Sequence, residues 1–263
     1  MVMNQQTEPY GMASTPSRFQ QPILPSCVIH LSPWRISCGL TVIIVGLILA
    51  GVAGQLSKYL FNHDTVFGLV RLFDLDQEGN IPAWYDSALL LLCSVLLGVI
   101  GQGKLLDRDP YMLHWRILAV IFLFMSLDEA AALHEMLIRP LRSTLHASGI
   151  FHYAWVIPGA VVVLLIGLSY LRFLATLPTK TRRLFILAGC LYVSGALILE
   201  FVEGYWASVY GSNTLTQRMI EAAQEVGEMF GLSVFLYALL AYIGTHFSEV
   251  RVQIDNITVA RDL

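Results

Sequence analysis

Six apolar segments, each long enough to cross a lipid bilayer as a helix, dominate the sequence. They cover about residues 36–60, 84–103, 115–138, 153–174, 183–206 and 217–247. A bilayer core accommodates about 20 helical residues, and a helix satisfies all of its backbone hydrogen bonds within its own segment. The sequence therefore predicts an all-α fold, a polytopic membrane helical bundle with about six transmembrane helices.

Composition excludes several other classes of protein. Apolar residues make up 56% of the chain and charged residues 13%, whereas soluble domains average about 25% charged residues. The net charge of −3 is too small to indicate a nucleic acid or another anionic polymer as partner. The four cysteines form no CxxC pair, which favours buried thiols over a zinc or redox site. We expect membrane lipid around the chain and no nucleic-acid partner.

The distribution of Lys and Arg predicts an orientation. With a cytoplasmic N-terminus, eleven of the sixteen Lys and Arg residues fall on the cytoplasmic side, as the positive-inside rule favours. The five on the outer side are Lys58, Arg71, Arg139, Arg142 and Arg218. We therefore expect a flexible cytoplasmic tail over 1–35, a transmembrane bundle over 36–248 with an outer loop at 61–83, and a cytoplasmic tail over 249–263.

Acidic residues gather at the outer ends of three of the predicted helices. Glu221, Glu225 and Glu228 are spaced i, i+4 and i+7, which places them on one face of a helix. In the predicted helix 115–138, Asp128 and Glu135 are seven residues apart and would also share a face. The residues predicted to form this layer are Asp128, Glu129, His134, Glu135, Glu200, Glu203, Glu221, Glu225 and Glu228.

So many carboxylates at one depth of a membrane need compensation. One charge at the centre of a membrane helix costs about 3 kcal/mol on insertion scales, and close carboxylates repel each other. A bound cation would balance them, and oxygen ligands with one imidazole suit Mn, Fe, Mg or Ca. We expect a divalent metal on ligands drawn from Asp128, His134, Glu135, Glu200, Glu203, Glu221, Glu225 and Glu228, with Glu129 as the catalytic base. A proton-sharing acidic vestibule without metal, and contact with another subunit, stay open.

Two stretches of the chain resemble a known group of proteins. FDLDQEGNIPAWYDS and FLFMSLDEAAALHE together resemble an uncharacterised family of bacterial multi-pass membrane proteins, over roughly the first three predicted helices. The resemblance implies a location in the bacterial inner (plasma) membrane or a related membrane. It implies no activity.

Three classes of function fit these features. The first is a metal-dependent membrane enzyme that acts on a lipid, isoprenoid or quinone-like substrate from the outer leaflet. The second is a cation or proton transporter, although transport sites usually lie near the midplane and these carboxylates lie towards one face. The third is a non-catalytic membrane subunit or assembly factor whose acidic face docks a partner protein or a second copy.

Overall fold

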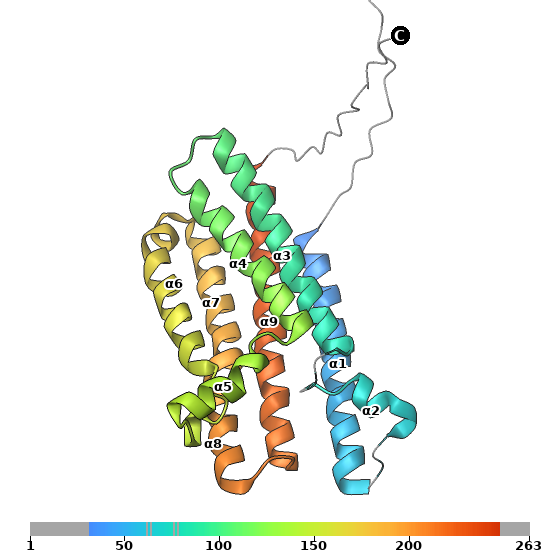
Figure 1. Ribbon diagram of the computed structural model, residues 1–263. Helices are drawn as coiled ribbons and strands as arrows, with labels where there is room; N and C mark the ends of the chain where they lie inside the picture. Colours follow the sequence, from blue (N-terminus) through green and yellow to red (C-terminus); the bar gives the residue numbers. More distant parts are fainter. Residues whose placement is uncertain (1–31, 62, 64, 76, 78, 248–263) are drawn as a thin grey trace, which may run out of the picture. The chain divides into compact units, whose positions relative to one another are not determined.

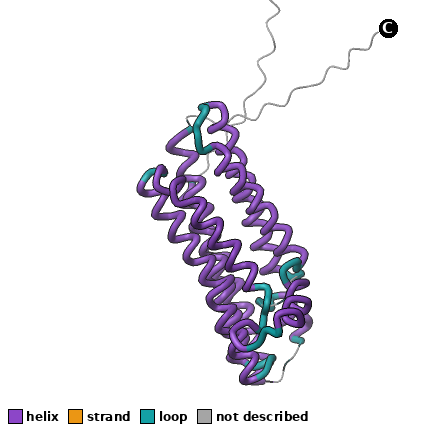
Figure 2. The backbone as a smooth tube through the Cα atoms, turned by 60° about the vertical axis from the view of Figure 1, so that its left-hand side comes forward, coloured by secondary structure: helices purple, strands orange, loops and turns teal. Residues whose placement is uncertain are grey.

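The computed structural model describes residues 32–247 apart from 62, 64, 76 and 78. This part of the chain is all-α and contains no strand, as Figures 1 and 2 show. The long helices are α1 (Pro33–Phe61), α3 (Ile81–Leu106), α4 (Met112–Ala131), α6 (Val156–Thr176), α7 (Thr179–Val193) and α9 (Leu215–His246). The shorter elements are α2 (Leu69–Leu72), α5 (Glu135–Leu145), α8 (Glu200–Tyr210), 3₁₀ turns at Val66–Gly68 and Gly149–Phe151, and a π-helical stretch at Ser194–Leu199.

Five helices of the described chain are long and apolar enough to cross a membrane. They are α1, α3, α6, α9 and the continuous helix Thr179–Tyr210 that joins α7 to α8. A sixth is counted if α4 and α5 form one bent span. The all-α class is confirmed, and the helices are compatible with a multi-pass membrane protein. Helix α1 begins before the predicted residue 36, and most of the predicted tail 1–35 and all of the predicted tail 249–263 lie outside the described residues.

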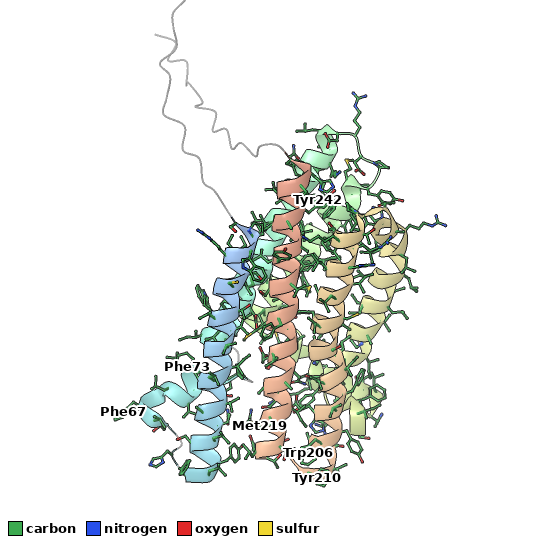
Figure 3. All side chains as sticks on the ribbon, turned by 180° about the vertical axis from the view of Figure 1, so that it is seen from behind. Phe67, Phe73, Trp206, Tyr210, Met219 and Tyr242 are labelled. Atoms are coloured by element: carbon green, nitrogen blue, oxygen red, sulfur yellow. The ribbon has the colours of Figure 1, made fainter. Side chains whose placement is uncertain are left out.

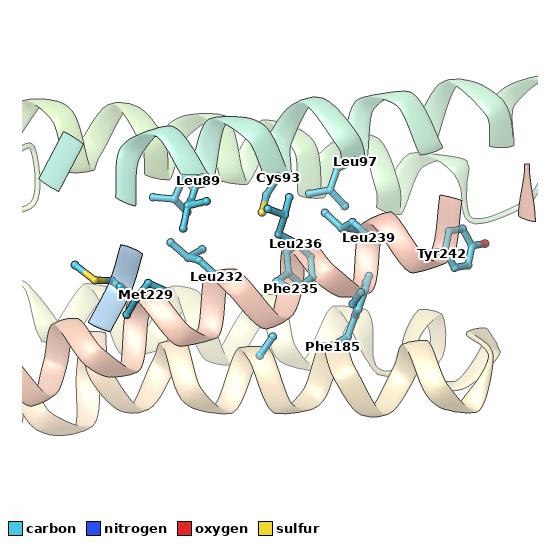
Figure 4. Packing of buried hydrophobic residues seen from close by; sticks show 14 of the residues in the cluster. Leu89, Cys93, Leu97, Phe185, Met229, Leu232, Phe235, Leu236, Leu239 and Tyr242 are labelled. Carbon is cyan, nitrogen blue, oxygen red and sulfur yellow. The ribbon is translucent and has the colours of Figure 1, made fainter. Parts of the chain in front are cut away.

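Helix α9 forms the centre of the packing, because it contacts α1, α3 and α7. Its buried apolar residues recur at the three- and four-residue spacing of one helix face. Figure 4 shows this face against α3 and α7. The labelled residues of this cluster are Leu89, Cys93, Leu97, Phe185, Met229, Leu232, Phe235, Leu236, Leu239 and Tyr242.

Glycines bring α9 very close to α7 and to the π-helical stretch. A Cβ atom added at Gly195 would lie 2.5 Å from the Gln224 carbonyl oxygen, and one at Gly231 would lie 2.8 Å from the Tyr192 nitrogen. A Cβ at Gly227 would lie 3.1 Å from the Leu191 carbonyl oxygen. Small residues permit such backbone approach between membrane helices. The contact places the polar face of α9 directly beside the start of α8.

The structure contradicts the predicted continuous helix 115–138. Helix α4 ends at Ala131, Ala132 adopts a left-handed backbone conformation with φ of 53°, and α5 runs at 88° to α4 (Figure 1). The Asp128 carboxylate accepts a hydrogen bond from the His134 backbone N–H at 2.8 Å, which stabilises the turn. Glu135 therefore lies on a different helix from Asp128, and the two do not share a helix face.

The segment that follows α1 folds back onto it. Gln55 on α1 donates a hydrogen bond to the Asp74 carboxylate at 2.7 Å, and Asn80 donates another to the Asp74 carbonyl oxygen. Asn80 also caps α3 by accepting a hydrogen bond from the Ala83 N–H. Phe67, by contrast, is fully exposed and points away from the bundle (Figure 3).

Candidate functional site

A cavity of about 740 Å³ collects the acidic residues predicted from the sequence. Its walls come from α4, α5, α6, α9 and the continuous helix Thr179–Tyr210, which comprises α7, the π-helical stretch and α8. All nine predicted site residues are among its lining: Asp128, Glu129, His134, Glu135, Glu200, Glu203, Glu221, Glu225 and Glu228. The structure therefore brings together residues that are about 100 positions apart in the sequence. Their roles as metal ligands or catalytic base stay predictions.

Side-chain amides from α9 hold the two carboxylates of α8. Gln224 donates from Nε2 to Glu200 and to Glu203, at 3.1 Å each. Gln217 donates to the other Glu203 oxygen at 3.0 Å and to the Tyr153 hydroxyl at 3.1 Å. Glutamine matches a carboxylate well because its NH₂ group provides two donors. The two glutamines are seven residues apart, on the face of α9 that also carries the acidic residues, and the sequence did not assign them a role.

Two of the cavity carboxylates have a basic side chain beside them. Arg218 donates to Glu221 at 2.9 Å, and this ion pair is almost completely buried. The His134 ring nitrogen Nδ1 lies 3.2 Å from the Asp128 carboxylate. Both pairs form at the ends of helices, Arg218 in the first turn of α9 and His134 just before α5.

A second group of carboxylates lies deeper, where α3, α4 and α9 meet. Asp86 on α3 interacts electrostatically with Glu129 and Glu228 and is hydrogen-bonded to Glu225. The Tyr192 hydroxyl on α7 is hydrogen-bonded to Glu228. We call Asp86, Glu129, Glu225 and Glu228 the inner carboxylates. Close like charges in a medium of low dielectric constant repel strongly, so this group requires protons or a cation.

Asp86 is the site residue that sequence reasoning missed. Its side chain is only 3% exposed, and its Oδ1 atom has no hydrogen-bond partner within the described part of the chain. A buried polar atom without a partner costs about 1–3 kcal/mol. The signal was available, because Asp86 is the one ionisable Asp, Glu, Lys or Arg in the apolar run 84–103. An ionisable residue within a membrane helix marks a functional site by default.

The rest of the cavity is apolar. Its lining includes Val120 and Phe124 on α4 and Val162 and Val163 on α6, and each of these four side chains is more than a third exposed. Leu137 of α5 lines the rim beside them. The cavity thus joins an apolar wall, open at the surface of the bundle, to an acidic end.

The carboxylates are spread along the cavity rather than gathered at one point. Among the described residues, no three Asp, Glu, His or Cys side chains are grouped closely enough to hold a metal ion. A metal bound here would have to draw the inner carboxylates together by rotation of their side chains.

His152, which follows the 3₁₀ turn at Gly149–Phe151, packs beside the cavity rather than within its lining. Its Cβ lies against Gly204 of α8, where an added Cβ would be 3.4 Å away. Burial, and then the neighbouring Arg142 guanidinium, lower the pKa of His152 below its ordinary value. The neutral imidazole is therefore the form that suits this packing.

The chain belongs to the family described as Domain of unknown function (DUF8692), which matches residues 38–243. This membership is consistent with the resemblance to an uncharacterised family. No curated protein matches the chain, and no solved structure matches it.

Proposed function

We propose that this chain is a multi-pass membrane protein that takes up a lipid-like molecule through the α4–α6 wall and acts on its polar end. The carrying observation is that one cavity joins an open apolar wall to a row of carboxylates. Ligand cavities usually measure about 300–1,000 Å³ and combine apolar lining with a few convergent polar groups. A cavity of about 740 Å³ would enclose the polar end and the first part of a hydrocarbon chain.

A position in the outer leaflet follows from the proposed orientation. Both termini are cytoplasmic in this proposal, in accordance with the positive-inside rule, and the acidic end of the cavity then faces outwards. Helix α5 supports this placement, because it lies at 88° to α4 and exposes Met136 and Leu137 beside Arg139 and Arg142. An amphipathic helix of this kind suits the boundary between head groups and acyl chains. The proposed location is a bacterial inner membrane.

A divalent metal is the alternative source of positive charge at the inner carboxylates, and it would require their side chains to rotate towards one another. Asp86, Glu129 and Glu228 would hold it, because each interacts electrostatically with the other two. The ion would supply Lewis-acid chemistry at the polar end of the substrate. Glu203, which Gln217 and Gln224 hold in place, would then orient the polar end of the substrate together with the remaining carboxylates.

Co-purified lipid tests the apolar half of this proposal. Val162→Trp would fill the cavity, and Val161→Trp is its matched control, because Val161 is equally exposed on α6 but does not line the cavity. The proteins would be purified in a maltoside detergent, and bound lipids would be extracted and measured by mass spectrometry. We expect one lipid class to be retained by the wild type and Val161→Trp and lost from Val162→Trp. Equal lipid in all three would contradict the proposal.

Cysteine labelling tests the orientation. On a background without the native cysteines, Phe67→Cys lies at the end of the bundle that carries the cavity and Arg108→Cys at the other end, in the turn between α3 and α4. An impermeant maleimide should label Phe67→Cys but not Arg108→Cys in intact cells. Labelling of Arg108→Cys alone would reverse the proposed orientation.

A further inference from the structure

We infer that the lipid-like ligand carries a positively charged nitrogen, an amine or a quaternary ammonium, at its polar end. This inference rests on the proposed function, because it concerns the same cavity. It assigns the balancing positive charge to the ligand itself. The contact group would be the inner carboxylates together with the aromatic rings at the acidic end of the cavity.

The lining of the cavity is strongly acidic. The lining includes eight carboxylates, and the described residues that form it include no Lys and no Arg. His134 is the only imidazole among them, and it is paired with Asp128. Arg218 reaches Glu221, at the outer end of the layer. The deeper residues Glu129 and Glu228 have other carboxylates among their electrostatic neighbours.

Asp86 provides a second, independent observation. It interacts electrostatically with Glu129 and Glu228, is almost completely buried, and does not itself line the cavity. Its Oδ1 atom has no hydrogen-bond partner among the described residues, although buried polar atoms are nearly always hydrogen-bonded. A cation held at Glu129 and Glu228, which do line the cavity, would therefore also balance the charge of this buried carboxylate.

Aromatic side chains at the same end favour a soft, organic cation. Trp155, Tyr153 and Tyr192 line the cavity, and the Trp155 ring lies 4.8 Å from the His134 ring. The indole N–H of Trp155 is directed to Glu200, so its polar edge is already satisfied. The ring packs against Gly159, where a Cβ would lie 3.0 Å from it. Aromatic faces attract ammonium groups, most of all where water is excluded.

Other occupants match the cavity less well. A phosphate or carboxylate head group would meet eight carboxylates and no Lys or Arg in the described lining. A neutral head group would supply no positive charge, so the inner carboxylates would have to be neutralised by shared protons instead. A bare metal ion would use neither the aromatic rings nor the apolar wall of α4 and α6. A cationic amphiphile uses all three features.

A series of probes with one chain length tests the inference. The purified full-length protein in an uncharged maltoside detergent would be titrated at pH 7 with hexadecylamine, hexadecyltrimethylammonium, hexadecanol and hexadecanoate, with and without a chelator. Binding would be followed by thermal shift and by tryptophan fluorescence. We expect at least one of the two cations to bind about tenfold more tightly than hexadecanol, which corresponds to about 1.4 kcal/mol. The comparison of the two cations distinguishes an amine from a quaternary ammonium.

Two variants locate the effect. Glu228→Gln should remove most of this preference for a cation. Asp107→Asn should keep it, because Asp107 is exposed and follows the end of α3 that is far from the cavity. Equal affinity for the cations and hexadecanol would overturn the inference and leave the proposed function intact. Tight binding of hexadecanoate that depends on a divalent metal would also overturn it, in favour of a metal site. Binding of none of the four probes would contradict the proposed function as well.

Discussion

The indole N–H of Trp155 donates a hydrogen bond to the Glu200 carboxylate at 3.0 Å, across 45 residues of sequence. Trp155 directly precedes α6, and Glu200 begins α8. The bond therefore connects the helix that forms one apolar wall to the helix that carries two of the cavity carboxylates. Both residues line the cavity, to which α6 contributes apolar side chains and α8 contributes carboxylates.

Trp155→Phe should destabilise the protein. The substitution keeps an aromatic ring but removes the donor, and a hydrogen bond to a charged group contributes about 1.5–3 kcal/mol. The loss would be measured as the change in the free energy of unfolding by denaturant in detergent. Trp84→Phe is the control, because Trp84 is 71% exposed and should change little. An equal effect of both substitutions would show that the Trp155 bond does not stabilise the fold.

Gly195→Ala should also destabilise the protein, in contrast to Gly189→Ala a short distance earlier in the same continuous helix. The new Cβ at 195 would meet the Gln224 carbonyl oxygen at 2.5 Å, whereas nothing lies within 4 Å of a Cβ at 189. Overpacking costs about 1–3 kcal/mol, and Ala otherwise favours a helix over Gly by about 1 kcal/mol. Thermal melting should therefore lower Tm for Gly195→Ala and leave it unchanged or raised for Gly189→Ala. A Tm for Gly195→Ala equal to that of wild type would mean that α9 is free to move away.

The stability of the wild type should fall with decreasing pH, partly because of His152. Burial and Arg142 lower the pKa of His152 in the folded state, so the unfolded chain binds a proton at higher pH than the folded one. The stabilisation is present above about pH 6.5, the ordinary pKa of histidine, and is lost as the pH falls from there through the folded pKa. His152→Asn should reduce the fall in Tm between pH 7.5 and pH 5.5. An unchanged pH dependence in this variant would assign the effect to other groups.

The amino-acid pattern was sufficient for most of the fold. Runs of about 20 apolar residues located the long helices, because length and hydropathy alone determine that signal. The clearest error is the end of α4. The residues Ala130, Ala131 and Ala132 favour a helix, yet the chain turns there, because the Asp128 side chain accepts a hydrogen bond from the His134 N–H. Local propensity gives no sign of this capping contact.

The site was predicted in part for a similar reason. Spacing on one helix and equal depth on three helices were enough to group the nine residues that line the cavity. Asp86 and Tyr192 were missed, because their membership depends on which faces of α3 and α7 turn towards α9. For α7, that choice is made by the close contact at Gly195, Gly227 and Gly231. Such contacts join residues that are distant in sequence, and a single sequence does not reveal them.

Glu228→Gln should raise Tm when no cation occupies the cavity. Glu228 lies among Glu225, Glu129 and Glu200, and removal of one ionised carboxylate from such a group relieves part of the repulsion between like charges. Asp107→Asn is the matched control at the opposite end of the bundle and should leave Tm unchanged.

Elemental analysis of the same preparations separates the two sources of positive charge. A stoichiometric metal in the wild type that is lost from Glu228→Gln, together with a lower Tm in the variant, would identify the cation as a metal, because the substitution would then have removed a ligand rather than a repulsion. A higher Tm in Glu228→Gln, with no metal in either protein, would mean that an organic cation or shared protons balance the inner carboxylates. The affinity of the variant for hexadecylamine would decide between these two.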